Sequence, residues 1–197
     1  MDIKWILQLA GVALGLLYLY LEYKANIWLW AVSMVMPIVH GYLYFTAGLY
    51  ADSGMQVYYV VAAVYGWSRW RAGKRMDGDS KPITHTPVRR LPMLVAVFAL
   101  AYALLAWILV TFTPSTVPYW DALTTALCVI GLWMLSEKWV EEWLVWLLAD
   151  ILTVGLYIYK GIPVTAGLYA VYSAMAVAGY LHWKKMAVPE NAVPSRP

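Results

Sequence analysis

A succession of long apolar runs constrains this chain more than any other feature. A membrane-spanning helix needs about 20 mostly apolar residues. Runs of about that length lie at roughly 4–22, 27–48, 53–70, 91–112, 119–136, 141–159 and 163–183. Of the 197 residues, 63% are hydrophobic and 13% are charged, an apolar excess that no soluble core of this size can bury. The sequence therefore predicts an all-α integral membrane protein with seven transmembrane helices.

The basic residues predict the orientation of these helices. The longest connection, 71–90, carries six Lys or Arg residues, and short basic loops stay in the cytoplasm. Counting alternately from this loop places the N-terminus outside and the C-terminus in the cytoplasm. Only Lys4 and Lys160 of the 14 basic residues then lie outside. We therefore expect a multi-pass protein of the bacterial cytoplasmic (inner) membrane.

An internal repeat emerges when the chain is aligned with itself at an offset of 113 residues. Matched pairs include Trp30–Trp143, Tyr44–Tyr157, Tyr59–Tyr172, Gly66–Gly179 and Trp70–Trp183. The repeat predicts two parallel three-helix halves and a linker helix, a 3+1+3 plan like that of SWEET transporters, whose substrate lies between the halves near the bilayer midplane. The expected parts are a first repeat over 1–70, a basic loop and linker helix over 71–112, a second repeat over 113–184 and a cytoplasmic tail over 185–197.

Asp150 is the clearest candidate for contact with a substrate. An ionisable residue deep in the membrane is costly and is a functional candidate by default. Trp143, Trp146 and Asp150 are spaced i, i+3 and i+7, which predicts one shared helix face. An acid beside two indoles suits an aromatic cation, because the rings attract it through their faces and the acid supplies the countercharge. The alternative is that Asp150 bonds a neighbouring helix as structural glue.

Residues near the middle of 27–48 are expected to approach the same site. Pro37 pairs with Asp150 through the repeat, and Met36 and His40 lie one helical turn apart on either side of it. His40 is interpreted either as a substrate contact or proton relay, or as a neutral imidazole bonded to a neighbouring helix.

Three further side chains complete the candidate site. Gln56 pairs with Tyr169 through the repeat, so two polar side chains fall at equivalent positions. Trp67 lies near the inner end of its helix and is interpreted as a substrate contact. The alternative interpretation is that Trp67 belongs to the aromatic belt at the membrane interface.

The sequence lacks the usual signs of an enzyme. It has no phosphate-binding glycine loop, no His/Cys cluster with metal spacing and no Ser-His-Asp arrangement. We therefore expect no enzymatic activity, no cofactor and no metal, and the basic loop is too short and too poor in aromatics to predict nucleic-acid binding. A seven-helix ligand receptor remains the alternative from another class, although the last helix has no mid-helix lysine for retinal.

Several short motifs, in their order and spacing, resemble the PnuC family of bacterial vitamin transporters. These are Leu49-Tyr50-Ala51 with Gln56, Tyr65-Gly66-Trp67 with Trp70, Trp120-Asp121, and Glu141 with Trp143, Trp146 and a polar residue at 150. The resemblance implies a 3+1+3 fold, a homotrimer and facilitated diffusion of an unphosphorylated vitamin, which a cytoplasmic kinase then traps.

The resemblance also bears on the substrate. Members that carry nicotinamide riboside typically show Asn at the positions of Asp150 and Met36, so this chain is more similar to the thiamine-carrying PnuT branch. Thiamine has a fixed positive charge that an acid can neutralise. Nicotinamide riboside is also a cation, and riboflavin remains a third candidate.

Overall fold

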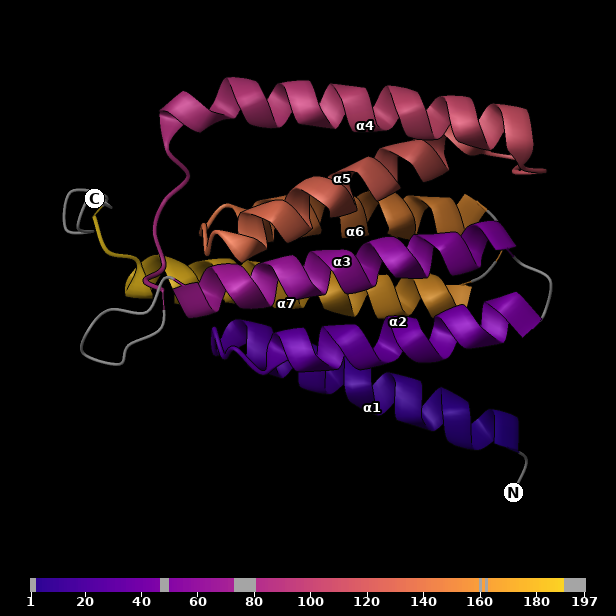
Figure 1. Ribbon diagram of the computed structural model, residues 1–197, viewed down its shortest axis with the longest axis horizontal. Coiled ribbons are helices and arrows are strands. Elements are labelled where there is room, and N and C mark those ends of the chain that lie inside the picture. The colour runs from indigo at the N-terminus through magenta and orange to yellow at the C-terminus, as the bar shows by residue number, and fades with distance from the viewer. Residues whose placement is uncertain (1–2, 47–49, 73–80, 160, 162, 190–197) are drawn as a thin grey trace. The chain divides into compact units, whose positions relative to one another are not determined.

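The computed structural model describes residues 3–46, 50–72, 81–159, 161 and 163–189, and these residues form an all-helical structure (Figure 1). The helices are α1 (Ile3–Tyr23), α2 (Leu29–Thr46), α3 (Tyr50–Ala72), the short 3-10 turn η1 (Val88–Arg90), α4 (Leu91–Phe112), α5 (Pro118–Ser136), α6 (Glu142–Tyr159) and α7 (Pro163–Met186). Each apolar run predicted as a helix is helical, and α4 begins and ends at the expected residues.

Proline marks where three of these helices begin. Pro92, Pro118 and Pro163 lie in the first turn of α4, α5 and α7. Proline suits this position because the first-turn N–H groups have no partner within the helix. Pro37 instead lies inside α2, where it removes one backbone hydrogen bond.

Three helices in the described part of the chain are long and apolar enough to cross a membrane. They span Val88–Phe112, Pro118–Ser136 and Glu142–Tyr159. The first of these, which includes α4, has a mean hydropathy of 2.6 and is only 11% buried. Such an apolar, uncovered helix needs lipid around it, so the chain is a multi-pass membrane protein.

The chain divides into two compact units, Met1–Lys81 and Pro82–Pro197. In unit 1, α2 contacts both α1 and α3. In unit 2, α4 contacts α5, α5 contacts α6, and α6 contacts α7. The predicted linker helix α4 therefore packs with the second unit, against α5.

A tryptophan wedge joins the last two helices of unit 1. Trp30 of α2 and Trp70 of α3 meet edge to face, with ring centroids 5.6 Å apart, and both are fully buried. The Trp30 ring lies so close to Gly66 that a Cβ atom there would come within 2.3 Å of it. Glycine is therefore what allows α3 to approach the indole.

The same wedge occurs in unit 2. Trp143 of α6 and Trp183 of α7 meet edge to face at 5.7 Å, and a Cβ atom on Gly179 would come within 2.5 Å of the Trp143 ring. These three residues are the repeat partners of the wedge in unit 1. The wedge is thus duplicated at the offset of 113 that the sequence shows.

The turn before each wedge is duplicated as well. Ala25 and Lys138 adopt the left-handed conformation, with φ of 49° and 54°. In the first turn Asn26 N–H donates to Leu21 O, and in the second Trp139 N–H donates to Met134 O. Together with the bonds from the left-handed residues to Glu22 O and Leu135 O, this is a Schellman motif, which satisfies carbonyls at a helix C-terminus.

A short extended segment, residues 82–87, which we name the linker strap, lies across the α5–α6 turn within unit 2. Thr84 N–H donates to Lys138 O, and Val140 N–H donates to Thr84 O. Val188 N–H, just after α7, donates to Ile83 O, and the Ile83 side chain is buried. The strap therefore ties together the α5–α6 turn and the end of α7.

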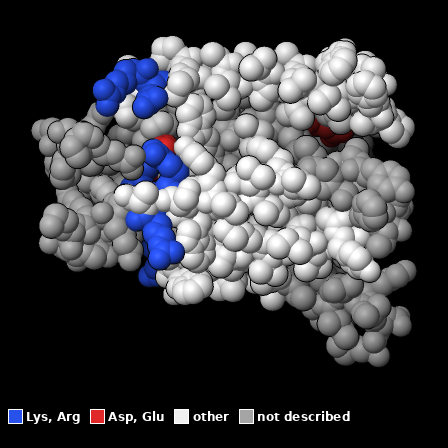
Figure 2. Space-filling view, viewed as in Figure 1, with Lys and Arg blue, Asp and Glu red and all other residues white. Residues whose placement is uncertain are grey.

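Basic side chains lie at helix ends. Arg69 and Arg71 occupy the last turn of α3, Arg89 and Arg90 precede α4, and Lys184 and Lys185 end α7. On the face drawn in Figure 2, the described Lys and Arg side chains gather at helix ends and leave the middle of the helices uncharged. This is the pattern of a protein whose helices cross lipid and whose basic ends lie in water.

Candidate functional site

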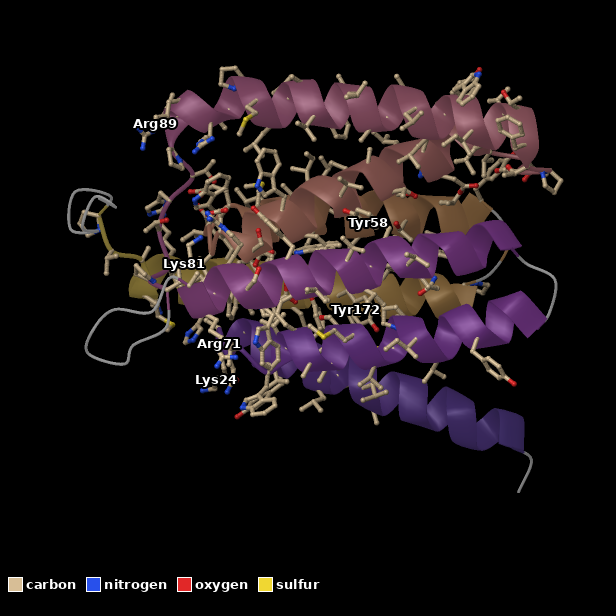
Figure 3. The ribbon with its side chains drawn as sticks, viewed as in Figure 1. Lys24, Tyr58, Arg71, Lys81, Arg89 and Tyr172 are labelled. Atoms are coloured by element: carbon tan, nitrogen blue, oxygen red, sulfur yellow. The ribbon has the colours of Figure 1, made fainter. Side chains whose placement is uncertain are left out.

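Asp150 lies in the middle of α6, half-buried within unit 2. It lies within electrostatic range of the thiol of Cys128 in α5 and of the hydroxyls of Tyr169 and Tyr172 in α7. Figure 3 labels Tyr172 on its helix. The acid therefore has polar neighbours from α5 and α7, and of the predicted site residues Tyr169 is brought near it.

Three tyrosines form an aromatic cluster beside this acid. Tyr157 and Tyr169 stack with ring centroids 5.6 Å apart and planes at 17°, and Tyr169 meets Tyr172 edge to face at 5.6 Å. Tyr157 and Tyr172 were not among the predicted site residues. The repeat could have indicated them, because it pairs Tyr157 with Tyr44 and Tyr172 with Tyr59.

Trp143 and Trp146 point to different neighbours. Trp143 is buried in the wedge against α7. Trp146 lies against α5, where a Cβ atom on Gly131 would come within 3.1 Å of its ring, and its Nε1–H donates to Glu142 Oε2 at 2.6 Å. Trp143 thus serves packing in this structure. The half-buried Trp146 lies one turn before Asp150 on α6, so the two side chains are neighbours on one helix face.

The other candidate residues belong to unit 1. Met36 is half-buried in α2, and the His40 side chain lies outside the described part of the chain, although its backbone is within α2. Half-buried Gln56 of α3 packs close to Gly41, where an added Cβ atom would come within 3.3 Å of Gln56 Cβ. Trp67 meets Trp28 edge to face at 5.8 Å. Contact of these residues with a substrate stays a prediction.

An ionic clamp holds the linker strap at the start of α6. His85 Nδ1 lies 2.6 Å from Glu141 Oε1, and the backbone N–H and hydroxyl of Thr86 donate to Glu141 Oε2 at 2.7 and 2.8 Å. Partial burial alone would raise the pKa of Glu141, but the hydrogen bonds from His85 and Thr86 outweigh it and lower the pKa below its usual value. The ionised carboxylate is therefore the form that holds the strap.

The side chains around Asp150 have the chemistry to bind an organic cation. A carboxylate attracts a positive charge, and tyrosine and tryptophan rings attract cations and stack on flat molecules. Within the described residues, no three His, Cys, Asp or Glu side chains gather closely enough to hold a metal ion. The described groups of unit 2 thus suit a flat, positively charged organic molecule.

Comparison with known proteins gives the chain a family context. The nicotinamide riboside transporter PnuC of Escherichia coli is 21% identical over an alignment of 206 residues. The alignment covers 92% of this chain and 86% of the relative. The riboflavin/roseoflavin transporter RibM of Streptomyces davaonensis is 27% identical over 188 residues, covering 89% of this chain and 83% of the relative.

A solved structure shares the fold. The crystal structure of the vitamin B3 transporter PnuC superposes with a TM-score of 0.66 at 20% identity, over 88% of this chain and 78% of that chain. A family model described as nicotinamide mononucleotide transporter matches residues 5–185. The chain therefore belongs to the nicotinamide mononucleotide transporter family, which includes the PnuC proteins.

Proposed function

We propose that this protein carries unphosphorylated thiamine across the cytoplasmic membrane by facilitated diffusion. The observation on which this depends is Asp150, an acid in the middle of a membrane helix in a chain whose relatives are named as vitamin transporters. A cytoplasmic kinase would trap the vitamin by phosphorylation, so the carrier itself needs no energy source and no enzymatic activity.

The chemistry around Asp150 supports a cationic substrate. A membrane carboxylate without a countercharge is costly, and a bound cation offsets that cost. The thiazolium ring of thiamine carries a permanent positive charge, and its aminopyrimidine can donate hydrogen bonds to a carboxylate. The cluster of Tyr157, Tyr169 and Tyr172 offers ring faces and hydroxyls near that acid.

The duplicated wedges and turns support the 3+1+3 plan. We propose that α1–α3 and α5–α7 are parallel repeats, with α4 as the linker and the substrate between the repeats. Met36, His40, Gln56 and Trp67 would then reach the substrate from the first repeat. The basic helix ends support a cytoplasmic C-terminus and an outside N-terminus, and a homotrimer is the assembly that we propose from the family resemblance.

Nicotinamide riboside is the second candidate substrate. It also carries a positive charge, and the E. coli relative, which matches 92% of this chain, is named as its transporter. Riboflavin, carried by RibM, has no positive charge, so an acid at position 150 favours it least.

A binding titration tests the substrate directly. The purified protein would be titrated with thiamine, nicotinamide riboside and riboflavin, and binding followed by quenching of tryptophan fluorescence. We expect thiamine to bind most tightly. Asp150→Asn removes the countercharge and should weaken thiamine binding about tenfold or more, which corresponds to a loss of roughly 1.4 kcal/mol.

The matched control is Asp121→Asn. Asp121 lies in the first turn of α5, where Ser115 Oγ–H donates to it, and asparagine can still accept that bond. If Asp150→Asn binds thiamine as tightly as the parent does, Asp150 is not the countercharge of the substrate. Tightest binding of nicotinamide riboside would establish the second candidate instead.

Transport in proteoliposomes tests the mechanism. Facilitated diffusion predicts that thiamine uptake runs down its own gradient at the same rate with and without a pH difference. Uptake that depends on the pH difference would contradict simple diffusion and point to proton coupling through Asp150 or His40.

A further inference from the structure

Glu142 is a buried acid that the proposed mechanism does not yet use. It is the first residue of α6, and none of its surface is exposed. Its Oε2 atom accepts a 2.6 Å hydrogen bond from Trp146 Nε1–H, one turn further along the helix. The indole of Trp146 is therefore held at its polar edge.

The same indole is held from a second side. Gly131 of α5 faces the ring, and a Cβ atom there would come within 3.1 Å of both Cε2 and Cζ2 of Trp146. The ring thus lies almost directly on the backbone of α5. With its edge bonded to Glu142 and the five–six ring junction against Gly131, the plane of the indole is fixed.

Packing alone does not require this hydrogen bond. In the described part of the chain, the buried indole N–H groups of Trp30 and Trp143 have no hydrogen-bond partner, yet both rings fill their wedges. A buried carboxylate, in contrast, is costly to desolvate. An acid placed to hold a half-buried ring therefore points to a need for a defined orientation of that ring.

The pair of Glu142 and Trp146 has no counterpart at the matching positions of unit 1. At the offset of 113, the partner of Glu142 is Leu29 and the partner of Trp146 is Ser33, whose hydroxyl donates to the Leu29 carbonyl. At these two positions, unit 1 thus has neither an acid nor an indole. The pair belongs with the chemistry that distinguishes unit 2, as Asp150 does.

We propose that Glu142 is a positioning residue that fixes the Trp146 ring at the angle on which a flat, cationic vitamin stacks beside Asp150. This inference rests on the proposed function. Trp146 touches the vitamin and Glu142 acts through it, by restricting rotation of the indole and so lowering the entropic cost of ordering the ring on binding.

The first experiment compares two substitutions by vitamin titration. Glu142→Gln keeps an oxygen that can accept the indole N–H bond, so we expect affinity within about threefold of the parent. Glu142→Leu removes the acceptor, and we expect about tenfold weaker binding, the loss associated with an unfixed binding side chain. In a Trp146→Phe background, Glu142→Leu should cause no further loss, because residues that act as a unit are non-additive.

The second experiment needs no vitamin. The protein would be labelled with fluorotryptophan, and the Trp146 line in the fluorine NMR spectrum assigned by its loss in Trp146→Phe. We expect the line to shift and broaden in Glu142→Leu and to keep its position and width in Glu142→Gln. A purely structural role of Glu142 would not single out this one line.

Gly131→Ala moves the same ring without altering Glu142. The added Cβ atom must displace the indole by a few tenths of an ångström, so we expect weaker vitamin binding and a shifted Trp146 line. Gly155→Ala is the matched control, because its new Cβ atom would meet only Trp120, at an ordinary 3.8 Å. This variant covers the case in which Glu142→Leu fails to fold.

The outcomes separate this inference from the proposed function. If the parent binds none of the vitamins, the proposed function fails, while the NMR arm still tests whether Glu142 fixes the ring. If the parent binds thiamine or nicotinamide riboside but Glu142→Leu and Gly131→Ala bind equally well, the positioning role is overturned. An equal loss for Glu142→Leu in the Trp146→Phe background would also overturn it, because Glu142 would then act by another route.

Discussion

The two units share their packing and differ in their polar groups. Both contain a tryptophan–glycine–tryptophan wedge and a Schellman turn at matching positions. Where unit 1 has Pro37, unit 2 has Asp150, and where unit 1 has Leu29, unit 2 has Glu142. The two units thus share the helix contacts of the wedge and the turn, while Asp150 and Glu142 of unit 2 have apolar residues at the matching positions of unit 1.

The turns show the same division. Glu141 in unit 2 binds the linker strap, whereas its repeat partner Trp28 packs edge to face with Trp67. The same backbone turn thus presents an ionic contact in one unit and an aromatic contact in the other.

The largest effect is expected at the wedge glycines. Gly66→Ala and Gly179→Ala each place a Cβ atom within 2.5 Å of a buried indole that has no room to move. We expect each substitution to lower the free energy of unfolding by about 3 kcal/mol, at the upper end for overpacking. Thermal unfolding in detergent measures this, with Gly155→Ala as the control in open packing. If alanine at only one wedge glycine lowers the free energy of unfolding no more than Gly155→Ala does, the wedges of the two units are not equivalent.

An intermediate effect is expected at the ionic clamp. Since the folded pKa of Glu141 is lowered, its ionised form stabilises unit 2 above the usual glutamate pKa of about 4.3, and this stability is lost as the pH falls through the folded pKa. We expect Glu141→Gln to cost about 1–2 kcal/mol at pH 7, from weakened hydrogen bonds to a charged group.

The measurement is the unfolding midpoint of the parent and of Glu141→Gln as the pH is lowered from about 7 to 3. The difference between the two should shrink at acid pH. Trp28→Phe, at the equivalent position of unit 1, should leave the pH dependence of the parent unchanged. If the unfolding midpoints of Glu141→Gln and the parent change with pH in the same way, Glu141 does not stabilise unit 2 through its charge.

The smallest effect is expected at the left-handed residues. Ala25 has a φ of 49°, a conformation that costs an alanine roughly 1 kcal/mol more than a glycine, so Ala25→Gly should stabilise unit 1 by about that amount. Lys138→Gly should not stabilise unit 2, because the lysine side chain is only 1% exposed and its buried contacts would be lost. Stabilisation by both substitutions, read as a raised unfolding midpoint, would show that the Lys138 side chain contributes nothing there.

The sequence predicted the helices well because each apolar run has the length of a membrane span. It also predicted the repeat, since Trp30, Gly66 and Trp70 have matched partners that form the same wedge. These features depend on local composition and on identity at a fixed spacing, and both can be read from one chain.

The directions of side chains could not be predicted in the same way. Trp143 and Trp146 share a helix face by spacing, yet one packs on α7 and the other on α5, because spacing gives an angle and not the neighbouring helix. The linker strap was missed for a related reason. It lies in a polar segment without periodicity, and its partner Glu141 is more than fifty residues further along the chain.

The linker strap also determines where mechanical tension would enter the second unit. The chain arriving from α3 is fastened at Thr84 and Thr86 to the α5–α6 turn before it reaches α4. A pull on that connection is therefore borne by Glu141 and the first turn of α6, the helix of Trp146 and Asp150, and α4 is shielded from it. A force on the linker strap would thus be transmitted to the start of α6 through the contacts of Thr84 and Thr86.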